Sequence, residues 1–303
     1  MRRAISRLII VGVPTVAVLA LLLVLGGWQW PASDFRVEES FAARNDWGVS
    51  PGVRLLSSND PVTASASGEV VFIGTGPPGG GNGGADRGIP HGLGSFVVLE
   101  HEGGFRSLYG NLEEPRLEGK RVLAEGDVVG SIGRTGFSGG NTLGFRILDT
   151  EQQAYVNPML LLPQLDDDAP PRVEDVVLAR GEELWELEGE PEVTPGGAEL
   201  RARIYDADGN GGPYRAPATV RSIAVAMNDE ETTAIELESL VDREGRLLLG
   251  ESRPVQELYD EEGRMRLGSI EVGPGESRIE ITARDHAGNK ERVEFLLRGE
   301  SSE

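Results

Sequence analysis

The sequence contains no cysteine, and only three of its 303 residues are histidines. Without cysteine there is no disulfide framework and no thiolate chemistry. The histidines, His91, His101 and His286, lie in no recognisable catalytic motif, and no serine nucleophile has a visible paired base. Nucleophilic catalysis of the common serine or cysteine kind therefore finds no support in the sequence.

Basic side chains are also scarce: 29 Lys and Arg stand against 50 Asp and Glu, which gives a formal net charge of −21. The imbalance is concentrated in residues 166–303, which carry 34 acidic and 16 basic side chains. Nucleic-acid binding needs a basic footprint, so we expect no nucleic-acid partner. The simplest interpretation of the acidic half is a well-solvated surface.

Long apolar runs are limited to the N-terminus. Arg2, Arg3 and Arg7 precede an uncharged run, residues 8–27, that would span about 30 Å as a helix, enough for one bilayer core. Trp28 and Trp30 follow at the position of a membrane interface. No clean small-x-small cleavage site follows, so we predict a single transmembrane anchor with the rest of the chain extracytoplasmic. A cleaved signal peptide remains the alternative.

Glycine is abundant, with 42 residues, and it favours many tight turns and an all-β chain. Residues 121–136 place apolar pairs between glycines, and residues 143–148 alternate with a period of two. Beyond an Asp/Pro-rich stretch at 164–171, alternating segments at 199–205, 220–226 and 277–283 are separated by Gly/Asp/Asn turns. Short strands with such turns are typical of a β-sandwich.

Several blocks resemble, in the right order, the LytM/lysostaphin-type zinc endopeptidases, which cleave peptidoglycan and have the duplicated hybrid motif fold. These are Pro61–Gly74, Ser95–His101, Phe105–Leu112, Arg121–Ile147 and the Val156-Asn-Pro158 ending. The turn motif near Asp285 is similar to the last hairpin of bacterial immunoglobulin-like modules. The expected organisation is an anchor (1–30), a linker and domain entry (31–60), a LytM-type domain (61–163), a linker (164–171) and an immunoglobulin-like β-sandwich (172–303).

The resemblance implies five catalytic positions, and this sequence departs from the family at each of them. The two ligands of the H-x-G-x-D element fall on Ser50 and Arg54, and the histidine of the Y-x-H element, after Tyr109, falls on Asn111. The H-x-H pair falls on Thr142 and Gly144. Arginine cannot ligate zinc, and a catalytic zinc needs about three protein ligands. We therefore predict no cofactor and an open, metal-free trough lined by these six residues.

Two other metal sites are conceivable from the residues. Asp86, His91 and His101 could form a rearranged zinc site, but ordering the Gly-rich loop at 75–94 around a metal would be entropically costly. Asp206-Ala-Asp-Gly-Asn210 has a partial likeness to a calcium loop, without the later bidentate Glu. A plain turn is the preferred interpretation there.

Three functions remain open. The first is a catalytically inactive envelope protein that binds peptidoglycan or regulates a cell-wall hydrolase, a role that the resemblance implies for degenerate family members. The second is an active metalloendopeptidase with a rearranged metal site. The third is a structural envelope protein that contacts a partner.

Overall fold

The structure, a computed structural model, describes residues 27–46, 48–58, 61–76, 92–136, 138, 140–206, 218–250 and 252–300. Within this part, strands dominate and the helical segments are two single 3₁₀ turns, η1 (Pro158–Leu160) and η2 (Val255–Glu257). The all-β prediction is confirmed. No helix of the described residues is long and apolar enough to cross a membrane, and residues 1–26 of the predicted anchor lie outside them.

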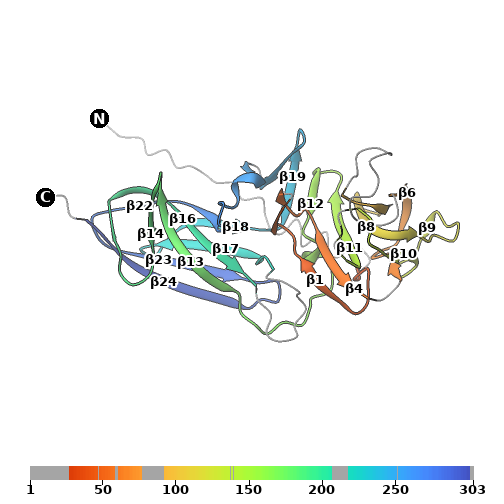
Figure 1. The fold of residues 1–303 in the computed structure, drawn as a ribbon, viewed down its shortest axis with the longest axis horizontal. Helices are drawn as coiled ribbons and strands as arrows, with labels where there is room; N and C mark the ends of the chain where they lie inside the picture. The colour runs from red at the N-terminus through yellow and green to blue at the C-terminus, as the bar shows by residue number, and fades with distance from the viewer. Residues whose placement is uncertain are drawn as a thin grey trace.

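The first domain, on the right of Figure 1, is built on one large sheet. Its strands follow the order β21-β20-β19-β12-β11-β8-β7-β6-β9, with β1, β4, β5 and β10 paired at the side. They are β1 (Phe35–Glu39), β4 (Val53–Ser57), β5 (Val62–Thr63), β6 (Gly68–Gly74), β7 (Ser95–Glu100), β8 (Phe105–Pro115), β9 (Val122–Leu123), β10 (Val128–Ile132), β11 (Thr142–Asp149), β12 (Ala154–Val156), β19 (Ser239–Arg243), β20 (Arg246–Leu249) and β21 (Arg253–Pro254).

The second domain, on the left, consists of two sheets that share one hydrophobic core. The first has the order β14-β13-β16-β22 and the second β15-β24-β23-β17-β18. Their bounds are β13 (Arg172–Arg180), β14 (Glu183–Glu186), β15 (Glu192–Val193), β16 (Gly196–Tyr205), β17 (Ser222–Met227), β18 (Glu230–Glu236), β22 (Met265–Val272), β23 (Gly275–Arg284) and β24 (Lys290–Gly299). The hairpin predicted around Asp285 is present, because β23 and β24 pair throughout their length.

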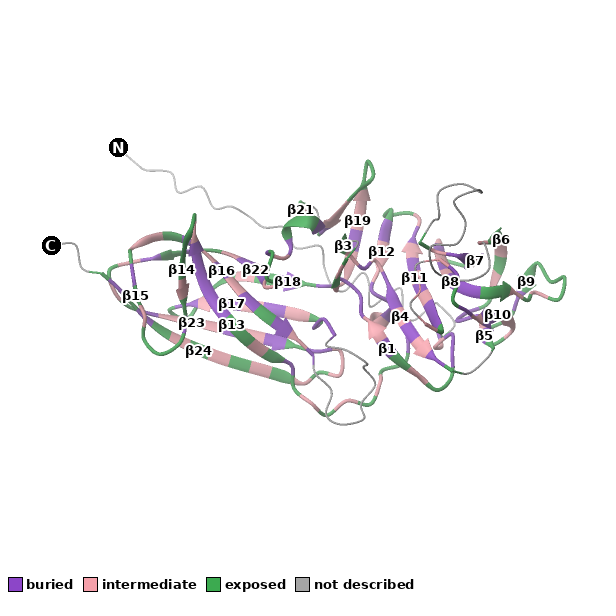
Figure 2. Ribbon diagram, viewed as in Figure 1, coloured by how far each residue is buried: buried purple, intermediate pink, exposed green. Residues whose placement is uncertain are grey.

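Period-two alternation predicts strands because successive side chains of a strand point to opposite faces of the sheet. Where one face packs on a core, buried residues alternate with more exposed ones, as in β11 (Figure 2). In β11, buried Phe145 and Ile147 alternate with half-buried Gly144 and Arg146. The neighbouring strands β7 and β8 show the same alternation at residues 95–99 and 105–109, and they contribute buried side chains to the first core.

The described residues between 31 and 58 form more regular structure than the expected linker and domain entry. They include β1 and β4, which pair with each other, and the small β2 (Arg44–Asn45) and β3 (Gly48–Val49) ribbon. Phe41 and Ala42, between β1 and β2, are fully buried in the core of the second domain. The Tyr259 hydroxyl donates to the Ala42 carbonyl at 2.9 Å, and Ser40 Oγ accepts from the Thr219 amide at 2.7 Å. This segment therefore joins both domains.

The two domains also share a sheet. β12 of the first domain pairs with β19, whose hairpin comes from the sequence of the second. Strands 239–254 thus extend the first domain's sheet beyond its own sequence range. Pattern analysis missed this because a strand's sequence does not encode which sheet edge it will join.

Trp28 and Trp30 were expected at a membrane interface, but both pack on the first domain. Trp28 is 8% exposed and its ring lies edge-on to His101 and Phe105. Trp30 Nε1 donates to the Pro163 carbonyl at 2.8 Å. The folded domain therefore begins at about residue 28, before the predicted anchor ends.

Candidate functional site

The three sequence blocks that match the catalytic elements come together on adjacent strands β4, β11 and β8. Arg54 lies opposite Gly144 across the β4–β11 ladder, and Gly144 lies opposite Gly110 across the β11–β8 ladder. The resemblance predicted this grouping of three distant segments, and the strand register places them side by side.

A cleft of about 260 Å³ opens at this position. Four of the six predicted residues line it: Ser50, Arg54, Asn111 and Gly144. The other lining residues are Glu39, Asn45, Val49, Pro51, Gly52, Val53, Gly92, Leu93 and Arg146.

Tyr109 and Thr142 differ from the expectation, because both are buried and neither lines the cleft. Tyr109 is fully buried and its hydroxyl accepts from the Ser65 amide at 2.8 Å. Thr142 is 1% exposed and its Oγ1 lies 2.7 Å from Ser138 Oγ. Because both side chains are buried, neither is exposed to a ligand in the cleft.

Asn111 connects neighbouring segments at the cleft through hydrogen bonds. Its backbone has a φ of +61°, a conformation that asparagine tolerates better than most residues. Its Nδ2 donates to the carbonyls of Gly92 at 3.1 Å and Thr135 at 2.8 Å, and its amide donates to Leu93 O at 2.6 Å. A Cβ on Gly144 would lie 2.9 Å from Asn111 Oδ1, so the glycine leaves room for this amide.

The residues at the zinc-ligand positions are engaged with the protein itself. Ser50 Oγ donates to Gly52 O at 3.1 Å, and Arg54 forms an ion pair with Glu39 at 2.8 Å. Together with Asn111, Thr142 and Gly144 they offer no imidazole and no free carboxylate. This donor set does not fit a zinc ion, which is held in proteins by His, Cys and Asp or Glu.

His101, a member of the conceivable rearranged site, is committed to the core of the first domain. Its Nδ1 lies 2.8 Å from Ser67 O and its Nε2 lies 2.7 Å from Ser107 Oγ. Burial lowers the pKa of His101, partly offset by the Ser67 carbonyl, so the ring is held in its neutral form. With both nitrogens occupied, His101 is not available to a metal. Asp86 and His91 lie outside the described residues.

Arg146 is a cleft residue that the sequence reasoning did not select. It follows Gly144 by two positions on β11 and therefore faces the same side of the sheet. Burial lowers the pKa of its guanidinium, while Tyr155 and Glu39 oppose that shift. Within the described residues no carboxylate forms a salt bridge with it, whereas Arg54 beside it pairs with Glu39 and Glu38. The alternation of β11 could have identified it, since it predicts that 144 and 146 share a face.

A larger hollow, about 890 Å³, lies at the other end of β4. It is lined by Arg36, Ser57, Arg134, Asn141 and Asp166 among others, and it contains none of the residues that match catalytic elements. Although this hollow is larger than the cleft, its volume alone is no reason to assign it as the functional site.

Residues 49–158 match the family model described as Peptidase family M23, and this part of the chain belongs to that family. A second family model, which carries no description, matches residues 170–299. A search of curated proteins finds no match.

Solved structures similar to this chain include a variant of the catalytic domain of the prophage-encoded M23 protein EnpA from Enterococcus faecalis. It shares 18% identity, covers 40% of this chain and 86% of its own, and has a TM-score of 0.33. The catalytic domain of lysostaphin from Staphylococcus simulans shares 21%, covering 39% and 82%, with a TM-score of 0.32. A chain of the SpoIIQ–SpoIIIAH pore-forming complex shares 21%, covering 46% and 93%, with a TM-score of 0.36.

Proposed function

We propose that this protein is a non-catalytic M23-type protein of the cell envelope whose cleft binds the carboxylates of peptidoglycan stem peptides. The observation that carries the proposal is Arg146, a half-buried guanidinium in the cleft without a salt-bridged carboxylate among the described residues. The matched family supplies the substrate class, and the loss of ligand chemistry at Ser50, Arg54, Asn111, Thr142 and Gly144 removes the zinc route.

The charge balance of the cleft favours an anionic ligand. Arg54 is paired with Glu39 and Glu38, whereas Arg146 has no salt-bridged carboxylate among the described residues, so its guanidinium is the cation placed to meet an anionic ligand. A guanidinium presents a planar fork of N–H donors that matches a carboxylate in two places. Partial burial of the arginine strengthens that interaction, because solvent screening is weaker there than on an open surface.

The alternative, an active endopeptidase with a rearranged metal site, would have to use residues beyond those at the family's positions. Elemental analysis of the purified protein, combined with digestion of cross-linked muropeptides, separates the two functions. We expect less than about 0.1 zinc per chain and no cleavage; one tightly bound zinc with cleavage abolished by a chelator would establish the enzyme.

The N-terminal run at 8–27 supports a further part of the proposal: a single-pass anchor in the cytoplasmic membrane with the M23 domain outside. A protein held there would meet peptidoglycan directly. A cell-wall hydrolase as the partner is the competing outcome, in which the domain regulates an enzyme without holding its substrate.

The test is calorimetric titration of the purified protein with a soluble stem peptide. Arg146→Met keeps the length of the side chain and removes the charge, and we expect affinity to fall at least tenfold, since hydrogen bonds to charged groups contribute about 1.5–3 kcal/mol. Arg106→Met is the matched control, because Arg106 lies on β8 and pairs with Glu100 outside the cleft. Equal affinity in both variants would show that the cleft is not the binding site.

A further inference from the structure

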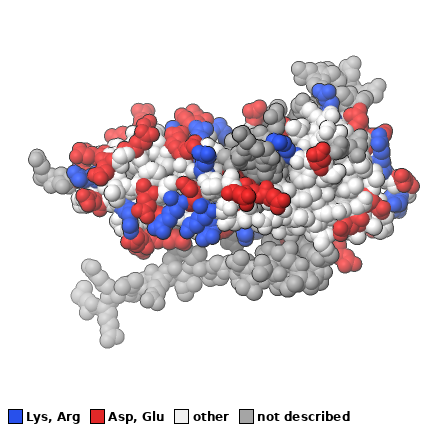
Figure 3. Space-filling model, turned by 90° about the horizontal axis from the view of Figure 1, so that it is seen from below, with Lys and Arg blue, Asp and Glu red and all other residues white. Residues whose placement is uncertain are grey.

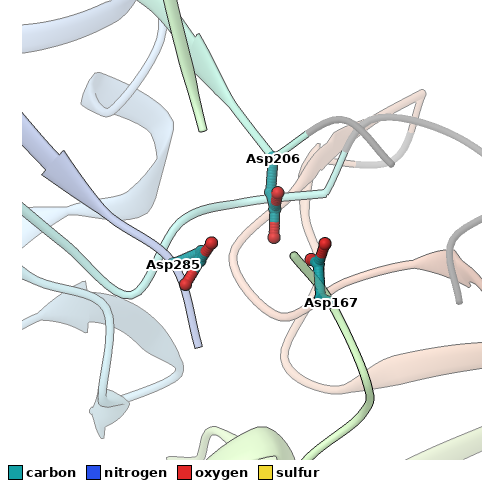
Figure 4. A group of neighbouring side chains, drawn as sticks. All are labelled: Asp167, Asp206 and Asp285. Atoms are coloured by element: carbon teal, nitrogen blue, oxygen red, sulfur yellow. The ribbon is translucent and has the colours of Figure 1, made fainter. Parts of the chain in front are cut away.

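Three aspartates from distant parts of the sequence converge at the junction between the two domains (Figure 4). Asp167 lies in the segment that joins the domains, Asp206 directly follows β16, and Asp285 directly follows β23. One carboxylate oxygen from each lies within 4.8 Å of the other two. Among the described residues, this is the group of His, Cys, Asp or Glu side chains that could share a metal ion.

Two of these carboxylates are held in the same way, with one oxygen fixed by the backbone. Asp285 Oδ1 accepts from the amides of Gly288 at 2.6 Å and Asn289 at 2.8 Å. Asp167 Oδ1 accepts from the Ala169 amide at 3.0 Å. The second oxygen of each, Oδ2, is buried and has no hydrogen-bond partner in the described structure. The backbone thus fixes the orientation of the Asp167 and Asp285 side chains, and the Oδ2 atom of each remains available as an acceptor.

The surrounding backbone fixes where the three carboxylates lie. Asn289 Nδ2 donates to the carbonyls of Asp167 at 3.0 Å and Ala169 at 3.2 Å, which ties the joining segment to the β23–β24 turn. Asp206 exchanges two backbone hydrogen bonds with Ala218, at 2.7 and 2.9 Å. These contacts come from elements far apart in the sequence, so the cluster is a product of the fold.

Burial makes the unpaired Oδ2 atoms of Asp167 and Asp285 costly. Asp285 is 1% exposed and Asp206 is fully buried, and Figure 4 shows the three carboxylates pointing toward one another. Buried carboxylates are normally paired with a cation or coordinate a metal. Among the described residues no Lys or Arg forms a salt bridge with Asp167 or Asp285, and a cation from solution would satisfy the unpaired oxygen of each.

We propose that Asp167, Asp206 and Asp285 form a calcium site that pins the joining segment to the second domain. Oxygen-only ligands suit hard cations, not zinc or copper. Calcium binds oxygens at about 2.3–2.6 Å, so oxygens on opposite sides of the ion lie about 5 Å apart, and a spread of up to 4.8 Å fits inside that shell. Water completes the coordination of such sites.

The position of the site gives it a mechanical role. The same turn contacts the end of the first domain, because Gln164 Nε2 donates to the Ala287 carbonyl at 2.9 Å and Asn157 Nδ2 lies 3.4 Å from His286 Nε2. A bound ion would therefore stiffen the joint between the domains at the calcium concentrations found outside cells. This inference does not depend on the peptide-binding proposal, which concerns a different surface.

The experiment measures thermal unfolding and calorimetric binding of the purified protein with EDTA, Ca²⁺ or Mg²⁺. We expect one Ca²⁺ per chain, and at about a hundredfold excess over Kd a rise in Tm of roughly 5–10 °C. Asp285→Asn keeps an oxygen for the Gly288 and Asn289 amides and removes one negative charge. It should match or exceed the wild-type Tm in EDTA and lose the calcium shift. Asp260→Asn is the control: Asp260 is also buried but pairs with Arg264, so this variant should unfold earlier yet keep the calcium shift.

The outcomes are separable. Absence of heat and of a Tm shift in wild type at 10 mM Ca²⁺ would overturn the site, as would a full calcium shift in Asp285→Asn. An equal shift with Mg²⁺ would overturn the assignment to calcium. If Asp285→Asn fails to fold, Asp167→Asn, in the less buried joining segment, serves as the second variant with the same expectation.

Discussion

Phe41→Ala tests whether the segment before the M23 domain is part of the second domain's core. Phe41 is fully buried in that core, although about 130 positions separate it from β13 in the sequence. Truncating a fully buried phenylalanine removes its transfer free energy and leaves a cavity, which together cost about 3–5 kcal/mol. That is a large part of the roughly 5–15 kcal/mol that stabilises a typical domain.

Urea unfolding monitored by circular dichroism gives the loss, and hydrogen exchange shows where protection falls. We expect the loss of protection in strands of the second domain, including β17 and β23, rather than only around residue 41. Phe72→Ala is the matched control: Phe72 is 57% exposed and stacks on Phe96 with ring centroids 5.5 Å apart, so its truncation should cost about 1 kcal/mol. A loss below about 1 kcal/mol for Phe41→Ala would refute the reasoning.

Further predictions concern pH and location. Because burial lowers the pKa of His101 below 6.5, the unfolded chain takes up this proton first. The stabilisation is present above about pH 6.5 and is lost as pH falls below it, so urea unfolding at pH 5 and 7.5 should differ less in His101→Gln than in wild type. The intact protein should sediment with membranes after lysis and resist carbonate extraction, and recovery of a mature N-terminus in the soluble fraction would contradict the anchor.

Residues with local signals were predictable from the sequence, and residues defined by long-range pairing were not. Alternation located β7, β11, β16 and β23, and the family resemblance brought Arg54, Asn111 and Gly144 to one place. Tyr109 was misplaced because its hydroxyl suggested an exposed position, whereas the Ser65 amide satisfies it in the core. Nothing local marks Phe41 as a residue of the second core, because only the complete fold places it there.

The charge distribution was predictable in the same sense. Counting residues placed the acidic excess in the second half, and on the face in Figure 3 charged side chains of both signs crowd the left-hand half, whereas on the right-hand half they lie mainly along the margin. What counting could not show is that three of those acids, Asp167, Asp206 and Asp285, converge and that Asp206 and Asp285 are buried, since burial is a property of the fold.

The pairing of β12 with β19 also has a consequence for the order of synthesis. When β12 leaves the ribosome, its partner strand is still unmade, and at 5–20 residues per second the wait is about 4–17 s. During that time the sheet ends in a row of unpaired N–H and C=O groups, which is a template for pairing with another chain. The hydrogen bond between Ser40 and Thr219 has a longer delay still, because 179 positions of sequence separate the two residues. Neither half of the chain can reach its final form before the other exists, so a fragment ending at residue 163 would keep an open edge that the whole protein closes.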